Sequence, residues 1–229
     1  MRYFGGKART CKQIANVINS AIQKKKFSTY IEPFCGGLWV TQYVKHFKRQ
    51  IYDINPFLID CYKAIQNGWV PPDTIDSTLY QQALKNEVEP HLRGFIGFGC
   101  SFAGKWFGGY ARSNERNYCL NAKNSLMKKF KNLDNCIFQC QDYRLLEPTD
   151  AIIYCDPPYA DTTKYDYIGN FDSVEFWQIM EKWSKNNTVI ISEYKAPDNW
   201  KCIYEIYTKT DIRNKNNQKE PRIEKLFTI

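Results

Sequence analysis

The chain has 229 residues and a formal net charge of +8, from 32 Lys and Arg against 24 Asp and Glu. Hydrophobic residues make up 43% of it and aromatic residues 16%, which is ample for a globular core. No apolar run reaches the roughly 18 residues of a membrane span. The basic excess is compatible with a polyanionic partner such as DNA but does not by itself require one.

The opening of the sequence and its cysteines indicate a cytoplasmic protein. Gly5, Gly6 and Lys7 interrupt the start where a signal peptide would be apolar. The nine cysteines are odd in number and lack zinc-like spacing, so we expect reduced thiols. His46 and His91 have no partner at metal-ligand spacing, and we expect no metal site.

A nucleoside-binding pattern occupies the first part of the chain. A short strand ending at Ile31 runs into a Gly36-Gly37 turn, and the apolar residues of 38–47 predict a helix after it. Glycines at such a turn let the backbone approach a nucleoside closely. The next predicted strand ends at Asp53, and an acidic residue about 20 positions after the glycines typically holds ribose hydroxyls.

The middle of the chain interrupts this pattern. Asn55-Pro56 predicts the start of a helix that stops near Gly68. Residues 66–116 then look irregular, and we interpret them as an inserted recognition element between a first part, 1–65, and a second part, 117–229. Cations and aromatics among glycines make the end of this element a candidate DNA surface, carried by Lys105, Trp106, Tyr110, Arg112 and Arg116. The alternative is a glycine-rich loop whose aromatics plug the edge of the core.

Regular structure is predicted again after the insert. The expected elements are helices over 118–133 and from Asp172 to 184, strands at 137–138, 151–154 and 188–192, and a hairpin of 202–207 with 222–229.

The tetrapeptide Asp156-Pro157-Pro158-Tyr159 follows the apolar run 151–154, so it lies where a buried strand ends. Two prolines have no N–H and leave stiff, outward carbonyl acceptors, beside a carboxylate and an aromatic ring. This arrangement fits the two donors of a planar exocyclic amine. Pro-Pro pairs are also common in ordinary loops, so the functional interpretation of the tetrapeptide depends on its occurrence together with the glycine turn and Asp53.

With these motifs in this order, the chain resembles S-adenosylmethionine-dependent DNA adenine-N6 methyltransferases of the Dam-like type, the alpha-type D12 class. The resemblance extends through Ser192-Glu193-Tyr194 and Glu224-Lys225-Leu226-Phe227. It implies an α/β fold with a Rossmann-like class I methyltransferase sheet, mostly parallel with a C-terminal hairpin, plus a small inserted recognition element.

The resemblance also implies roles for residues. The opening Tyr3 to Lys7 is similar to an aromatic-x-Gly-Gly-Lys element that encloses the methionine end of the cofactor, and residues 32–37 are similar to a Phe-x-Gly-x-Gly motif whose usual last glycine is here Leu38. Asp53 matches the ribose-binding acid, and Asp142 resembles the residue that meets the cofactor's adenine. The implied cofactor-binding residues are Tyr3, Phe4, Gly5, Gly6, Lys7, Glu32, Phe34, Cys35, Gly36, Gly37, Asp53, Ile54, Asp142, Tyr143 and Asp156.

The implied reaction is direct methyl transfer from S-adenosylmethionine to N6 of an adenine flipped out of double-stranded DNA. Asp156 and Pro157 would accept hydrogen bonds from the NH₂ group, Pro158 would stiffen the turn, and Tyr159 would stack on the base. The expected setting is the nucleoid or a phage-infected cell, with a cognate restriction endonuclease as a further partner in a restriction–modification system. Cytosine-N4, RNA or protein-amide methylation and a catalytically silent DNA-binding module stay open as alternatives.

Overall fold

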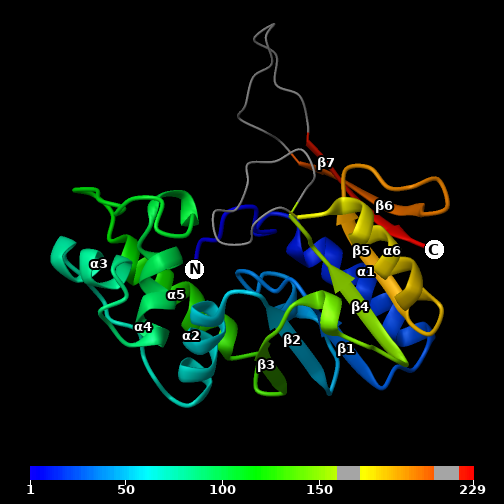
Figure 1. Cartoon of the computed structure of the whole chain (residues 1–229), viewed down its shortest axis with the longest axis horizontal. Helices are drawn as coiled ribbons and strands as arrows, with labels where there is room; N and C mark the ends of the chain where they lie inside the picture. Colours follow the sequence, from blue (N-terminus) through cyan, green and yellow to red (C-terminus); the bar gives the residue numbers. More distant parts are fainter. Residues whose placement is uncertain (159–170, 209–221) are drawn as a thin grey trace, which may run out of the picture.

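Seven strands form one sheet in the order β3-β2-β1-β4-β5-β7-β6 in the computed structural model, which describes residues 1–158, 171–208 and 222–229 (Figure 1). The strands are β1 Thr29–Glu32, β2 Arg49–Asp53, β3 Cys136–Cys140, β4 Ala151–Cys155, β5 Thr188–Glu193, β6 Lys201–Thr208 and β7 Arg222–Thr228. Strands β1 to β5 pair in parallel, whereas β7 runs antiparallel to both β5 and β6. The expected mostly parallel, Rossmann-like sheet with a C-terminal hairpin is confirmed.

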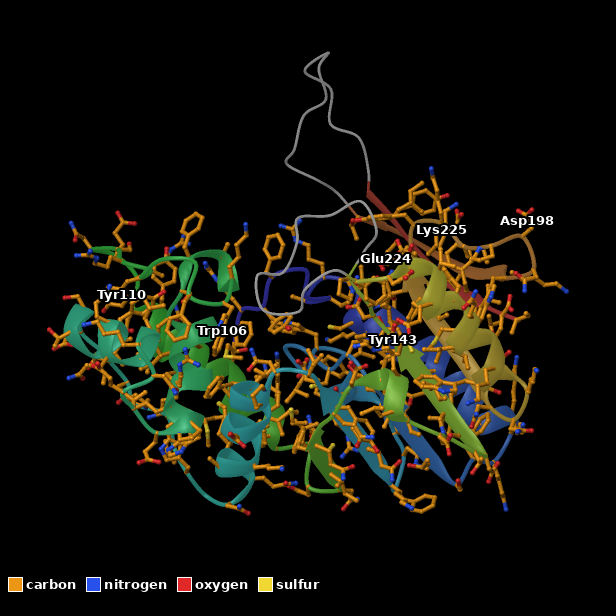
Figure 2. The ribbon with its side chains drawn as sticks, in the orientation of Figure 1. Trp106, Tyr110, Tyr143, Asp198, Glu224 and Lys225 are labelled. Atoms are coloured by element: carbon orange, nitrogen blue, oxygen red, sulfur yellow. The ribbon has the colours of Figure 1, made fainter. Side chains whose placement is uncertain are left out.

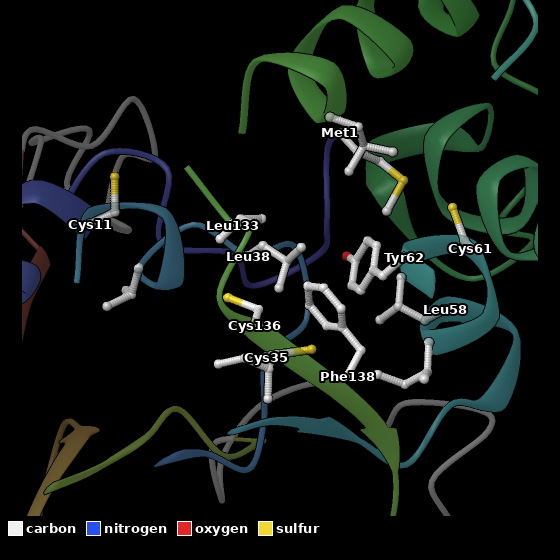
Figure 3. Packing of buried hydrophobic residues seen from close by; sticks show 14 of the residues in the cluster. Met1, Cys11, Cys35, Leu38, Leu58, Cys61, Tyr62, Leu133, Cys136 and Phe138 are labelled. Carbon is white, nitrogen blue, oxygen red and sulfur yellow. The ribbon is translucent and has the colours of Figure 1, made fainter. Parts of the chain in front are cut away.

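The central strands are buried on both faces, as expected for a parallel sheet covered by helices. In β4, Ile152 and Tyr154 face one hydrophobic cluster, while Ile153 and Cys155 face the other. Helices α1 (Cys11–Lys24), α2 (Pro56–Gln66) and α5 (Tyr118–Phe130) contribute to the first cluster, and α6 (Ser173–Ser184) to the second. Figure 3 shows Tyr62 of α2 against Phe138 of β3, with ring centroids 5.5 Å apart.

The predicted helix starts are confirmed, because polar side chains cap them. Asn55 accepts a hydrogen bond from the Leu58 N–H at 3.0 Å, with Pro56 in the first turn of α2. Asp172 accepts from the N–H groups of Val174 and Glu175 at the start of α6. Caps of this kind satisfy N–H groups that have no partner within the helix.

The predicted helix over 38–47 is wrong. The segment forms turns and one short 3-10 helix, η1 (Thr41–Tyr43). Side chains from elsewhere bind the carbonyls that a helix would use: Asn19 donates to the Tyr43 carbonyl and Arg49 to those of Thr41 and Val44. Leu38, Val40 and Val44 are buried separately in these turns, whereas Phe47 is exposed, so the apolar spacing only resembles that of a helix.

Residues 66–116 are more regular than predicted. They contain α3 (Ser77–Leu84) and α4 (Pro90–Gly99), and α4 packs on α2 so closely that Gly94 touches the backbone of Phe57. The glycines interleaved with aromatics therefore serve helix packing in α4. Figure 1 shows α2 to α5 gathered on one side and the sheet with α1 and α6 on the other.

Candidate active site

A cavity of about 980 Å³ opens at the carboxyl ends of β1, β2 and β4. The order of the strands reverses between β1 and β4, which is where open α/β sheets bind ligands. The cavity is lined by Tyr3, Phe4, Gly5, Gly6, Lys7, Glu32, Phe34, Cys35, Gly36, Gly37, Asp53, Ile54, Asp142, Tyr143, Asp156, Pro157 and Pro158. The structure thus brings together every cofactor-binding and catalytic candidate from the sequence that it describes; Tyr159 lies outside the described residues.

Two side chains that were not among the predicted site residues donate hydrogen bonds to the glycine turn after β1. Tyr62 of α2 donates to the Gly36 carbonyl, and the ammonium of Lys129 on α5 donates to the Gly37 carbonyl. Lys129 also lies 3.4 Å from the ring centroid of Trp39, and its burial lowers its pKa to about 7. These contacts fix the turn, in which Gly36 and Leu38 have φ of +42° and +56°.

Asp53 ties this turn to the start of α2. One carboxylate oxygen accepts from the Gly36 N–H and the other from the Asn55 N–H, both at 3.0 Å. Burial raises the pKa of Asp53 to about 6, although the backbone donors pull it down. The carboxylate is therefore preorganised at the cavity wall and charged at neutral pH.

Glu32 ends β1 beneath the same turn. The hydroxyls of Tyr30 and Thr41 both donate to its Oε2 atom at 2.7 Å. Burial raises the pKa of Glu32 to about 8, despite these two donors. Glu32 is thus a buried carboxyl group that takes up a proton at higher pH than Asp53 does.

An aromatic wall and an ion pair form the side of the cavity after β3. The ring of Tyr143 lies 5.0 Å from that of Phe34, and Phe171 adds a third ring. Asp142 accepts a forked pair of hydrogen bonds from Arg144, which lowers the pKa of its carboxyl group. Any ligand that uses Asp142 shares it with Arg144, which the sequence analysis did not select.

Asp156, at the end of β4, meets a buried lysine. The Lys7 ammonium lies 2.8 Å from Asp156 Oδ1 and 3.2 Å from Glu224 Oε1. Glu224 on β7 was not among the predicted site residues. The sequence holds one clue to it: Glu224 and Leu226 are two positions apart in β7, so both side chains point to the same face of the strand, where Leu226 is fully buried.

The cavity is acidic although the protein is basic. Seven carboxyl side chains and three cationic ones, Lys7, Arg9 and Arg144, line it. Such a wall favours a positively charged ligand. Within residues 1–158, 171–208 and 222–229, no group of three or more His, Cys, Asp or Glu side chains could hold a metal ion, and no described helix is long and apolar enough to cross a membrane.

The predicted DNA-contacting residues lie on the helical side of the molecule, where Figure 2 labels Trp106 and Tyr110. The Trp106 ring is 4.8 Å from Phe98, and the Tyr110 hydroxyl donates to the Ile75 carbonyl at 2.6 Å. These two aromatics thus have packing roles within the protein. Three predicted cations and one aromatic that the sequence analysis did not select are exposed: Lys105, Arg112, Arg116 and Phe102.

The loop that carries these residues also contacts the cavity wall. The Phe4 N–H donates to the Gly104 carbonyl at 3.0 Å, and the Lys105 ammonium lies 4.6 Å from the Phe4 ring centroid. Ala103 lines the cavity itself. The loop of residues 103–105 and the opening segment of the chain therefore share one rim of the cavity.

Comparison with known proteins gives a family match over most of the chain. The sequence model of the family described as D12 class N6 adenine-specific DNA methyltransferase matches residues 3–93 and 104–220. No curated protein matches. The sheet order and the family match together identify a class I methyltransferase fold.

Three solved structures are similar. Precorrin-6y C5,15-methyltransferase from Geobacter metallireducens has 7% identity and a TM-score of 0.44, with 99% of this chain and 93% of that chain covered. The rRNA methyltransferase aviRa from Streptomyces viridochromogenes has 10% identity and a TM-score of 0.38, with 94% and 84% covered. TrmN from Thermus thermophilus has 9% identity and a TM-score of 0.39, with 94% and 47% covered.

Proposed function

Since the chain belongs to the D12 class N6 adenine-specific DNA methyltransferase family, we propose that this methyltransferase modifies N6 of an adenine extruded from double-stranded DNA, with S-adenosylmethionine as methyl donor. The observation that carries the proposal is the position of Asp156 and Pro157. They stand at the end of β4, on the wall of the cavity that the glycine turn and Asp53 also line.

The cavity fits the cofactor in shape and charge. A side chain at Gly36 would come within 2.8 Å of the Tyr3 ring, so the turn keeps a bare backbone at the wall. Asp53 would accept hydrogen bonds from ribose hydroxyls, and the excess of carboxylates complements a sulfonium. Bound S-adenosylmethionine would supply an activated methyl group.

The residues at the end of β4 would activate the acceptor. The Asp156 carboxylate and the Pro157 carbonyl accept hydrogen bonds from the adenine NH₂ group and draw its lone pair out of conjugation with the ring. The same two acceptors stabilise the positive charge that develops on nitrogen as the N–C bond forms. Tyr159 is assigned to stacking on the flipped base by its motif position. No cysteine is needed as a nucleophile.

A nucleoside analysis tests the proposal. The protein is incubated with cofactor labelled in the methyl group and with a mixture of DNA and RNA, which is then digested. Label in N6-methyladenine of DNA supports the proposed function. Label in N4-methylcytosine, in RNA or in protein assigns another acceptor, and no label at all indicates a silent binding module.

Asp53 provides a test of the cofactor site. Asp53→Ala should weaken S-adenosylmethionine binding by roughly 1–3 kcal/mol, because ribose hydroxyls lose a charged acceptor. Affinity for the wild type should fall as the pH is lowered through about 6, where Asp53 gains a proton. Isothermal titration calorimetry across pH 5–8 measures both effects.

Asp53→Asn and Asp60→Asn complete the experiment. The first keeps the size of the side chain and should flatten the pH dependence near 6; the second alters a carboxylate on α2 outside the cavity wall and should change neither affinity nor its pH dependence. Unchanged affinity in folded Asp53→Ala would contradict the assignment.

The exposed cations of the inserted element test the DNA surface. If Lys105 and Arg112 meet phosphates, replacing either by Ala should weaken binding of all DNA sequences alike and lower the salt slope by about one ion. Fluorescence anisotropy at several salt concentrations measures the slope. Lys26→Ala, at an exposed position shortly after the end of α1, serves as the control. A loss confined to one sequence would make the residue a base reader, and an unchanged slope would remove it from the DNA surface.

A further inference from the structure

Lys7 is a buried cation held between two carboxylates. The side chains of Lys7, Asp156 and Glu224 are only 8%, 19% and 11% exposed. Burial alone would lower the pKa of Lys7, but Asp156 and Glu224 together hold it above its ordinary value. Lys7 therefore stays charged at neutral pH, and one ammonium serves two acids.

The direction of β7 is what delivers Glu224 to this place. In the register of β7 with β5, Leu226 pairs with Ser192 and Lys225 with Glu193, the last residue of β5. Because β7 is antiparallel, its first residues lie at the carboxyl edge of the parallel strands. Glu224 precedes Lys225 in β7, so it lies at this carboxyl edge, and its side chain is on the same strand face as that of the buried Leu226.

Glu193 is a third acid near Lys7, Asp156 and Glu224, and it is placed differently. Its Oε1 accepts from the Tyr194 N–H at 2.7 Å, and burial raises its pKa to about 7. It forms no ion pair with Lys7 among the described contacts. Of the acids that the structure describes, Glu224 and not Glu193 therefore shares Lys7 with Asp156.

We propose that Glu224 is a positioning residue for methyl transfer: it shares the Lys7 ammonium with Asp156, so that Lys7 neutralises less of the negative charge of the Asp156 carboxylate. The inference rests on the proposed role of Asp156. If Lys7 paired with Asp156 alone, the pair would be neutral and would stabilise a positive charge on N6 less well. With Glu224 present, Asp156 keeps more of its own negative charge for the amine, and that charge is fixed in a buried site before reaction, where it acts most strongly.

The test is a double-mutant cycle on the single-turnover rate. Glu224→Gln, nearly the same size but neutral, should slow methyl transfer by roughly 10- to 100-fold while cofactor affinity changes by less than about threefold. Glu224→Asp, which keeps the charge, should recover part of the rate. In a Lys7→Met background, Glu224→Gln should add little, because Glu224 acts through Lys7.

Controls separate this role from a structural one. Glu205→Gln removes a carboxylate from the neighbouring strand β6, where it pairs with Lys225 at 3.2 Å, and should leave the rate unchanged. A wild-type rate for Glu224→Gln, or losses that simply add in the Lys7→Met background, would overturn the proposal. If Glu224→Gln does not fold, the cycle is measured with Glu224→Asp instead. The proposal would again be overturned if the losses of Glu224→Asp and Lys7→Met simply added in the double variant.

The cycle is read separately from the proposed function. Wild-type protein that labels an acceptor other than DNA adenine contradicts the proposed substrate, and the cycle is then measured on the amine that is labelled. The positioning role of Glu224 stands or falls on the coupling with Lys7 in either case.

Discussion

The Asp156→Ala variant is expected to lose on the order of 100-fold or more in the single-turnover rate of methyl transfer while still binding cofactor and DNA. In the proposed reaction Asp156, at the end of β4, is the side-chain acceptor for the adenine amine, and its removal would take away a fixed negative charge next to N6. Lys7 keeps Glu224 as a partner in the variant, since the two atoms are 3.2 Å apart. The local fold should therefore survive.

Rapid-quench assays with saturating cofactor and DNA measure this rate. Asp156→Asn tests charge at constant shape and should also be slow. Asp198→Ala is the matched control, because Asp198 is an exposed aspartate that Figure 2 shows at the far edge of the sheet side. A near-wild-type rate for Asp156→Ala would remove the residue from the reaction.

Gly94→Ala should destabilise the fold by about 3 kcal/mol or more. A Cβ atom at Gly94 would lie 1.9 Å from the Phe57 carbonyl oxygen, a backbone atom of the neighbouring helix α2, so α4 would have to move away. Overpacking of a core typically costs about 1–3 kcal/mol, and a rigid backbone contact belongs at the upper end. In a helix with free space, the same substitution would instead stabilise by up to about 1 kcal/mol.

Urea unfolding followed by circular dichroism measures the change. Gly68→Ala is the comparison: an added Cβ meets nothing within 4 Å there, but φ is +94°, so only backbone strain of about 1–2 kcal/mol is expected. Equal losses for the two variants would mean that α2 and α4 do not pack as closely as described.

The sequence alone predicted the elements that are marked by a local cap or by an uninterrupted apolar run. The caps at Asn55 and Asp172 mark their helices because a side-chain oxygen satisfies a nearby N–H. The run 151–154 marks a buried strand because both of its faces are covered. The family resemblance added the order of the motifs, and the structure places them around one cavity.

Contacts between distant segments explain what the sequence did not predict. The carbonyls of Thr41, Tyr43 and Val44 are bound by Asn19 and Arg49, so no local pattern could reveal that the segment is not a helix. The glycines of α4 look like loop residues until α2 is placed beside them. Lys129 and Glu224 reach the site from α5 and β7, which are far along the chain from the glycine turn. The clue to Glu224 in the sequence is that it points to the same face of β7 as the buried Leu226.

The free cysteines make the interior of the protein accessible to labelling kinetics. Seven of the nine thiols are buried, and Cys140 and Cys202 are exposed. Figure 3 shows Cys35, Cys61 and Cys136 among apolar side chains. A buried thiol reacts with a soluble reagent only when its surroundings open, so each reports the free energy of its own local opening.

Replacing Cys140 and Cys202 by Ser would leave reporters in both halves of the molecule. Cys100 and Cys119 lie on the helical side, and Cys155 lies in β4. Mass spectrometry of peptides after timed labelling would rank their rates of modification. Equal rates mean that the helical side and the sheet open as one cooperative unit, whereas faster labelling of the first two would reveal that the helical side opens on its own.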